Sequence, residues 1–200
     1  MASPFPPSHR ADVRGGAYGS HRRRRLAAQR RRAAGTHGRR LSGFEWSIHV
    51  AILHWRPRSL GRFAVDPLLA RKHREHHCDP RQIELIFIPW QTLVWVIPTA
   101  VAIALMAFPR LGLGLTYLIS LTALGLAYEW THYLIHSDYK AKTVLYQAIW
   151  RNHRRHHFKN EHYWFTVTSS GTADRLLGTY PNQSTVPTSP TAKNLHGATR

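Results

Sequence analysis

The chain has 200 residues, a length that suits one domain, and a formal net charge of +18 at pH 7. Its single cysteine, Cys78, excludes an internal disulfide and any multi-cysteine zinc or iron–sulfur site within one chain, which favours a reducing, cytosol-facing environment. The mean hydropathy of −0.36 resembles that of a soluble protein, but only because polar ends offset a strongly apolar centre.

The first 40 residues form an arginine-rich segment. Residues 1–40 contain eleven arginines, no lysine and one acid, Asp12. Because this composition shows no helical or strand periodicity, we expect a disordered tail. Such a tail could bind nucleic acid, lie on anionic lipid, or result from a start codon placed too early. Because the chain also contains two long apolar runs that predict a membrane hairpin, described below, we favour the last two interpretations.

A short helix is expected at 43–55. Its uncharged part, 46–55, is too short to cross a bilayer, which takes about 20 residues, so the helix should lie in the interface. It carries His49 and His54 in an HxxxxH motif. Residues five apart lie roughly 140° apart around an ideal helix, so these two reach one ion only if the helix is distorted. Otherwise they reach two separate ions.

A second helix, from about 67 to 78, is expected in the basic stretch that follows. It should end before Pro80, because the residue that precedes a proline avoids the α region. This helix carries an HxxHH motif formed by His73, His76 and His77.

Two long uncharged runs form the apolar centre of the chain. Residues 85–109 and 111–128 are separated by a single charged residue, Arg110, and each run is long enough to cross a membrane. We therefore expect transmembrane helices at about 86–108 and 111–130, in preference to a buried pair of soluble helices.

The hairpin sets the side on which the histidines lie. Two crossings return the chain to its starting side, so the histidines before and after the hairpin face one compartment. All lysines and arginines except Arg110 lie outside the hairpin. The positive-inside rule therefore places the histidines and both termini on the cytosolic side.

Two further histidine motifs follow the hairpin. His132 and His136 form HxxxH, and His153, His156 and His157 repeat HxxHH on a segment expected to be helical. Positions i, i+3 and i+4 share one helical face, and binding a transition metal is the leading reason to crowd imidazoles there. Taken alone, the last motif could also be a solvated basic helix, because arginines are interleaved with its histidines.

Ten of the fifteen histidines fall in these four motifs, which is too many for one ion. Two ions with four or five nitrogens each would use the whole set. All-imidazole ligation suits iron, copper, zinc or nickel. A site at a membrane surface would meet lipid C–H bonds, which require redox chemistry with dioxygen. We therefore favour two iron ions, with zinc as an ion that could be found in a purified sample.

The remaining residues are read from composition. Residues 158–167 are aromatic and suit packing at the headgroup boundary. Residues 174–180 are expected to be a last short ordered turn. Residues 182–200 are rich in Ser, Thr and Pro, and we expect a disordered tail.

The order of the motifs resembles that of the fatty acid hydroxylase / sterol desaturase superfamily of membrane di-iron enzymes. The phrases EWSIHVAILH, HREHH, EWTHYLIH, HRRHHFKNEHYWF and DRLLGT carry the resemblance, over a domain at 41–181. By this resemblance the metal ligands are His49, His54, His73, His76, His77, His132, His136, His153, His156 and His157.

The resemblance also implies a reaction. One oxygen atom from O2 would enter a lipid C–H bond, with electrons from an external donor such as a ferredoxin or a small haem protein with its reductase. The FKNEHYWF phrase is closer to lipid hydroxylases than to carotene hydroxylases. Fatty acids, sphingolipids, sterols and carotenoids stay open as substrates, and desaturation stays open beside hydroxylation.

Two features depart from the family pattern. The arginine-rich tail stands where family members usually have apolar spans before the first motif. Thr166 stands in WFTV where the family more often has glycine, so a backbone conformation with φ > 0 there would be strained.

Four other polar residues near the motifs are weaker candidates. We expect His162 to be a surface residue more than an added ligand, and Cys78 to be a spectator. Glu129 and Glu45 are expected at best to support a neighbouring histidine.

We therefore predict an all-α integral membrane protein in which one transmembrane hairpin carries interfacial and cytosolic helices that form a histidine-rich metal-binding cap. The predicted function is a non-haem di-iron oxygenase that hydroxylates a lipid. The alternatives are a non-catalytic membrane protein that binds zinc or another divalent metal and, less favoured, a nucleic-acid-binding protein that works through the arginine tail.

Overall fold

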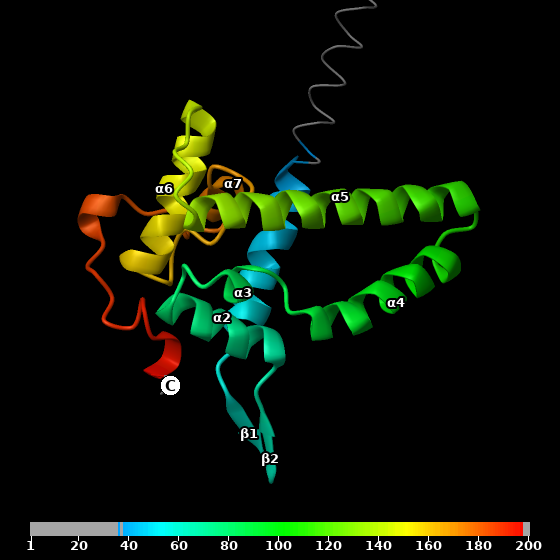
Figure 1. Ribbon diagram of the computed structural model, residues 1–200, viewed down its shortest axis with the longest axis horizontal. Coiled ribbons are helices and arrows are strands. Elements are labelled where there is room, and N and C mark those ends of the chain that lie inside the picture. The colour runs from blue at the N-terminus through cyan, green and yellow to red at the C-terminus, as the bar shows by residue number, and fades with distance from the viewer. Residues whose placement is uncertain (1–35, 37, 198–200) are drawn as a thin grey trace, which may run out of the picture. The chain divides into compact units, whose positions relative to one another are not determined.

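The structure, a computed structural model, describes residue 36 and residues 38–197. The chain divides into two units, 1–40 and 41–200. Most of the predicted arginine-rich tail lies outside the described residues. The second unit is mostly helical and contains every histidine motif (Figure 1).

The first helix ends in an unusual wide turn. Residues 38–48 are α-helical and continue directly into a π-helix, η1 (His49–Leu53). The backbone N–H of His54 donates to the carbonyl oxygen of His49 at 3.0 Å, a bond that spans five residues in place of the usual four. The helix expected at 43–55 is therefore present, with one turn widened.

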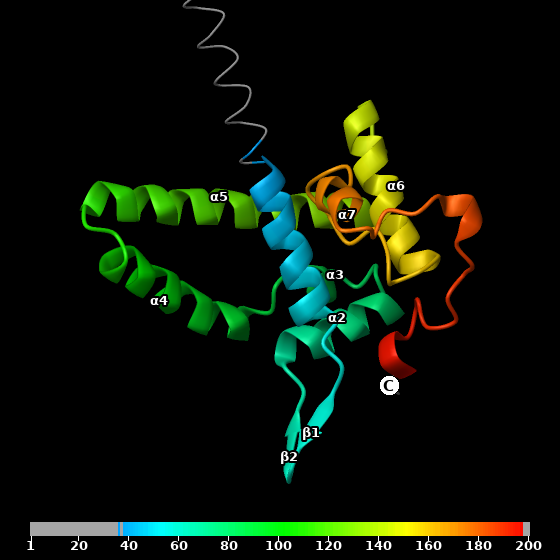
Figure 2. The same cartoon turned by 180° about the vertical axis from the view of Figure 1, so that it is seen from behind.

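A small antiparallel hairpin follows and corrects the all-α prediction. Strands β1 (Arg58–Leu60) and β2 (Phe63–Val65) project away from the helices (Figures 1 and 2). Leu60 pairs with Phe63 across a two-residue turn that begins at Gly61. Gly61 has a φ of +60°, a conformation that glycine adopts without steric cost and that two-residue hairpin turns require.

Helix α2 (Leu68–Cys78) carries the first HxxHH motif. It begins after Pro67, whose fixed φ suits the start of a helix, and ends ahead of Pro80, as the sequence predicts.

Two helices of the described chain are long and apolar enough to cross a membrane. The first candidate runs over Ile83–Met106, where α3 (Ile83–Ile86) is followed by α4 (Trp90–Met106), and the second is α5 (Leu111–His136). Only 11% and 6% of their most apolar stretches are buried inside the protein, whereas the core helix of a soluble protein would be mostly buried. Helix α5 runs beyond the expected end at 130 and so carries His132 and His136.

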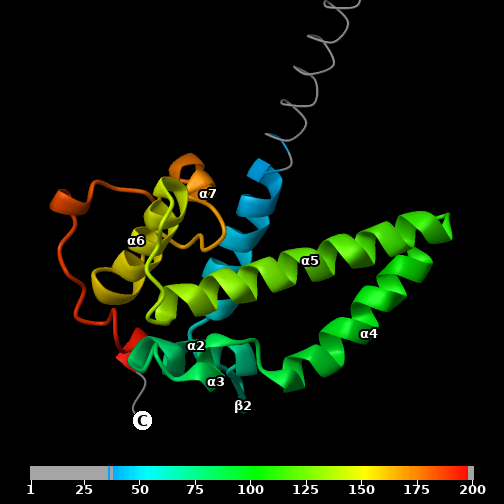
Figure 3. The same ribbon diagram turned by 45° about the horizontal axis from the view of Figure 1, so that its top comes forward.

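Helices α4 and α5 run antiparallel from a tip at Arg110 and diverge toward the histidines (Figures 1 and 3). Gly114 permits their close approach, because a Cβ atom at this position would lie 2.5 Å from the carbonyl oxygen of Ala104. Helix α4 continues through Pro98, and proline is tolerated within apolar helices of this kind.

Helix α6 (Val144–Phe158) carries the second HxxHH motif. Thr143 caps its start, since the Thr143 hydroxyl accepts a hydrogen bond from the backbone N–H of Tyr146 at 3.2 Å. A small core formed by Ile135, Ile149 and Val167 joins α5, α6 and the loop after α6. The loop leads to α7 (Thr172–Leu176).

A disordered tail was expected at 182–200, but the described residues of this stretch, 182–197, have a defined structure. Two short 3-10 turns, η2 (Gln183–Thr185) and η3 (Leu195–Gly197), bound a segment that packs on the histidine helices. Three of its apolar side chains are buried: Val186, Ala192 and Leu195. The prediction of disorder was based on the small number of apolar residues. A segment that is held mainly by hydrogen bonds needs few of them, so composition alone does not reveal its order.

Candidate metal centre

The structure brings the ten histidines of the four motifs together in two groups of five. Within each group, one ring nitrogen from every residue lies within 4.8 Å of the others. Group A consists of His49, His54, His73, His77 and His156. Group B consists of His76, His132, His136, His153 and His157.

Each HxxHH helix contributes to both groups. On α2, the i and i+4 residues His73 and His77 belong to group A, while His76 between them belongs to group B. On α6 the assignment is reversed, because His153 and His157 belong to group B and His156 to group A. The groups therefore lie side by side, and the rings of His77 and His157 stack with their centroids 4.1 Å apart.

The π-helical turn resolves the geometry of the first motif. An α-helix would turn His49 and His54 away from each other, but a π-helix has about 4.4 residues per turn and returns the chain to the same face after five residues. The two ring centroids are 5.0 Å apart, and both rings belong to group A. The distortion that the sequence requires for a shared ion is thus present.

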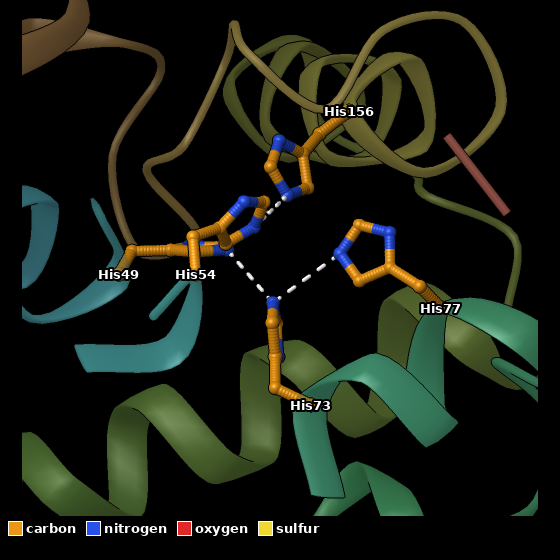
Figure 4. A group of neighbouring side chains, drawn as sticks. All are labelled: His49, His54, His73, His77 and His156. Atoms are coloured by element: carbon orange, nitrogen blue, oxygen red, sulfur yellow. Dashed lines mark hydrogen bonds between the residues drawn. The ribbon is translucent and has the colours of Figure 1, made fainter. Parts of the chain in front are cut away.

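The nitrogen positions fit a metal ion. In group A, the Nε2 atom of His73 lies 3.2 Å from the Nε2 atoms of both His49 and His77, as the dashed lines in Figure 4 show. In group B, the Nε2 atom of His153 lies 3.1 Å from those of His136 and His157. Two nitrogens about 2.0–2.1 Å from one ion are about 2.9–3.4 Å apart at angles between 90° and 109°. The observed separations lie in this range.

Burial keeps these imidazoles neutral. Loss of solvent lowers the pKa of His49, His73, His153 and His157 well below 6.5, and repulsion from neighbouring imidazoles lowers it further. Burial also lowers the pKa of His156 to about 4, although a hydrogen bond to the carbonyl of Tyr163 opposes the shift. A neutral imidazole has the free lone pair that a metal ion needs.

Backbone carbonyls orient three of the rings. The Nδ1 atom of His77 contacts the carbonyl oxygen of Ala192 at 2.8 Å, that of His132 contacts Ile86 at 2.9 Å, and that of His156 contacts Tyr163 at 2.8 Å. A neutral ring that donates its proton from Nδ1 presents an unprotonated Nε2 to the group. Contacts of this kind are typical of metal-bound histidines.

Several buried ring nitrogens of these histidines have no hydrogen-bond partner among the described residues, and two of them are Nε2 atoms. Nε2 of His76 and Nε2 of His132 are buried without a hydrogen-bond partner among the described residues, and both belong to group B. An unsatisfied buried polar atom is costly, and a metal ion bound by group B would satisfy both. Together with the separations and the neutral rings, this makes both groups suited to metal ions.

The loop after α6 holds group A from one side. Phe165 lies against three rings of this group, with centroid distances of 5.5 Å to His49, 5.4 Å to His54 and 5.2 Å to His156. Before it, Trp164 is fully buried and has a left-handed φ of +56°, a strained conformation for a residue other than glycine.

Two acidic residues fix this loop. The buried carboxylate of Asp174 accepts hydrogen bonds from the backbone N–H groups of Phe165 and Thr166 at 2.9 and 3.0 Å, and from the Thr166 hydroxyl at 2.6 Å. Glu45 accepts hydrogen bonds from the backbone N–H groups of Val167 and Thr168. The sequence predicts that Glu45 at best supports a neighbouring histidine, whereas its hydrogen bonds go to this loop, and sequence reasoning assigned no role to Asp174.

The strain considered for Thr166 lies elsewhere. Among described residues other than glycine, only Trp164 and His196 have positive φ, so Thr166 has an ordinary backbone conformation. Its hydroxyl bonds Asp174, a contact that a glycine could not make.

The three other weak candidates also lie outside the two groups. The side chain of His162 is 57% exposed and lies 3.6 Å from Glu161. The Glu129 carboxylate accepts a hydrogen bond from the backbone N–H of Ile88, which steadies the start of the first apolar helix. Cys78 is a free, half-buried thiol.

This fold and this site define a helical protein with two apolar helices and a histidine-rich centre suited to metal ions. The family model described as fatty acid hydroxylase matches residues 41–179, and the chain belongs to this family, within the fatty acid hydroxylase / sterol desaturase superfamily. The family points to an oxidoreductase that modifies lipids. Neither the curated proteins nor the solved structures gave a match.

Proposed function

We propose that the protein is a membrane-bound non-haem di-iron oxygenase that hydroxylates a C–H bond of a lipid. The observation that supports this most is the pair of adjacent groups of five histidines, all buried except the half-buried His54. The family match independently points to lipid oxidation. Groups A and B would each hold one iron ion through the ten histidines.

The chemistry follows from the substrate. Two iron ions, when bound, supply the redox chemistry with O2 that an unactivated C–H bond requires and that zinc does not supply. The overall reaction converts a lipid C–H bond, O2, two electrons and two protons into a C–OH group and water. The electrons would come from an external donor, a ferredoxin or small haem protein with its reductase.

The protein's own residues would position the metal ions and exclude bulk water from them. The ten imidazoles are held as neutral donors by burial, so they can bind cations without first losing protons. Burial also keeps bulk water from the two groups, which favours oxidation of the lipid over side reactions.

The apolar helices would place the site at the membrane. Large side chains such as Trp95, Leu105 and Met106 are exposed on α4, and acyl chains would cover them. At about 1.5 Å per residue, α5 is about 39 Å long, against about 30 Å for the hydrocarbon core of a bilayer. Its last two turns, which carry His132 and His136, would then stand at the polar boundary, with the metal centre and both termini in the cytosol.

The test combines metal content with product analysis. Wild-type protein purified in nanodiscs should contain about two iron ions per chain, and cells that express it should accumulate one lipid class that is heavier by one oxygen atom. His153→Ala, which alters group B, should lose the oxidised lipid and contain fewer than two iron ions per chain. The matched control is His162→Ala, which removes a half-exposed histidine outside both groups and should keep both the iron ions and the oxidised lipid.

Two results would contradict the proposal. Protein without iron and without any O2-dependent product would exclude an oxygenase. Stoichiometric zinc in both groups without product would favour the non-catalytic metal-binding alternative.

A further inference from the structure

The C-terminal segment lies beyond the family match and yet contacts group A. The family model ends at residue 179, whereas residues 186–196, here named the C-terminal strap, pack against α2, α6 and the π-helical turn. We infer that this strap positions group A for metal binding. The inference rests on the proposed metal-binding role of the histidines.

The first contact orients a proposed ligand directly. The Nδ1 atom of His77 lies 2.8 Å from the carbonyl oxygen of Ala192, which is itself buried. Since a carbonyl oxygen can only accept, Nδ1 carries the proton and Nε2 faces His73 at 3.2 Å. The strap thereby fixes both the rotation of the ring and its tautomer.

The second contact holds the π-helical turn. The Nε2–H group of His196 donates to the backbone carbonyl of His54, with 3.2 Å between the two atoms. His54 is the most exposed member of group A. The strap therefore contacts two of the five residues of group A, on two different elements.

A clamp at the end of α6 keeps the strap in place. The backbone N–H of Ser189 donates to the carbonyl of Lys159 at 2.7 Å, and the hydroxyls of Ser189 and Thr191 both donate to the buried Glu161. Burial alone would raise the pKa of Glu161, but the hydrogen bonds from Thr191 and Ser189 lower it below 4.5.

An apolar plug fixes the other end. Leu195 has no exposed surface, although it lies in a stretch of small and polar residues. Between clamp and plug, the strap passes Ala192 directly over His77. The described part of the chain shows no comparable contact from the strap to the rings of group B, whose oriented member His132 bonds Ile86 instead.

The experiment measures each group separately. Two histidines are removed from one group at a time: His136→Ala with His153→Ala leaves only group A intact, and His49→Ala with His54→Ala leaves only group B intact. Full-length protein in nanodiscs is titrated with Fe²⁺ against a competing chelator, with and without Leu195→Asp. In the first background Leu195→Asp should weaken binding by about 10–100-fold, the usual cost of losing a group that orients a ligand. In the second it should change nothing.

Matched variants separate positioning from folding. Leu195→Met keeps an apolar plug and should restore binding to group A. Thr188→Ala changes an exposed strap residue and should behave as wild type. Glu161→Gln weakens the clamp without touching a histidine of either group, and should again weaken group A alone. Far-UV circular dichroism checks that each variant keeps its helices.

The outcomes are distinct. Equal Fe²⁺ affinity of group A with and without Leu195→Asp would overturn the inference, and so would equal weakening of both groups. A wild-type protein that binds no metal in either group would overturn the proposed function itself, and the inference with it. A protein that binds metal in both groups but oxidises no lipid would contradict only the proposed function.

Discussion

The carboxylate of Asp174 offers the sharpest test of how the centre is held. It is fully buried and accepts four hydrogen bonds, one from each of two backbone N–H groups and one from each of two hydroxyls. Asp174→Ala would remove both acceptor oxygens and with them all four hydrogen bonds. The hydroxyls of Thr166 and Thr179 can rotate toward other partners, but the backbone N–H groups of Phe165 and Thr166 cannot.

The magnitude follows from these two donors. Each buried, unsatisfied N–H group costs about 1–3 kcal/mol, so the variant should lose about 2–6 kcal/mol of unfolding free energy. Whole domains are stable by only about 5–15 kcal/mol. For a chain of this size, about 2–4 °C are lost per kcal/mol, so the apparent Tm should fall by about 4–24 °C.

The assay is thermal unfolding of purified protein in detergent, with bound metal measured in parallel. Asp138→Ala is the matched control, because its side chain is 93% exposed and its ion pair with Arg81 is a surface one. Asp174→Asn should be intermediate, since an amide can accept from some donors but not all. A Tm within about 2 °C of the control would refute the reasoning.

Three further predictions concern the site and the apolar helices. Without metal, the protein should become less stable as the pH falls from 6.5 to about 4. Burial lowers the pKa of His156 to about 4 in the folded chain, so the unfolded chain takes up this proton at a higher pH than the folded one. A Tm that stays flat over this pH range would contradict the prediction. Trp164→Gly should be more stable than Trp164→Ala by about 1 kcal/mol in denaturant titrations. Both variants lose the packing of the indole ring, but only glycine adopts a φ of +56° freely. Equal stability of the two variants would argue against backbone strain at this position. Gly114→Ala should lower the unfolding free energy by about 1–3 kcal/mol, because the new Cβ atom would meet Ala104. Gly125→Ala, which has open space around it, should be neutral or stabilising in the same thermal assay. The reverse order would mean that α4 and α5 do not pack as described.

Sequence reasoning found the histidines because helical periodicity is a local property. The spacings of His73, His76 and His77 and of the second HxxHH motif predict that their rings share a helical face, and α2 and α6 are indeed helices. The division of each motif between two groups was not predicted. It depends on which helix faces which, and this is decided by tertiary packing rather than by spacing.

Two other features escaped for a related reason. The β1–β2 hairpin was missed because its segment was read for charge, although Gly61 between Leu60 and Phe63 is a turn signal. The C-terminal strap was missed because its composition is polar. Its order comes from hydrogen bonds to Glu161 and to the backbone of α6, partners that no local pattern reveals.

The π-helical turn leaves the chain no slack at this point. The helix before it is tied to the far side of the loop by Ser42, which accepts from the backbone N–H of Ala173, and by Trp46, which donates to Thr179. The residue after the turn, His54, is itself a member of group A. Shortening residues 50–53 by one would restore an ordinary α-helix but swing one anchored end about 100° around its axis. We expect length changes here to be tolerated far less well than any single substitution at the exposed positions of the same turn.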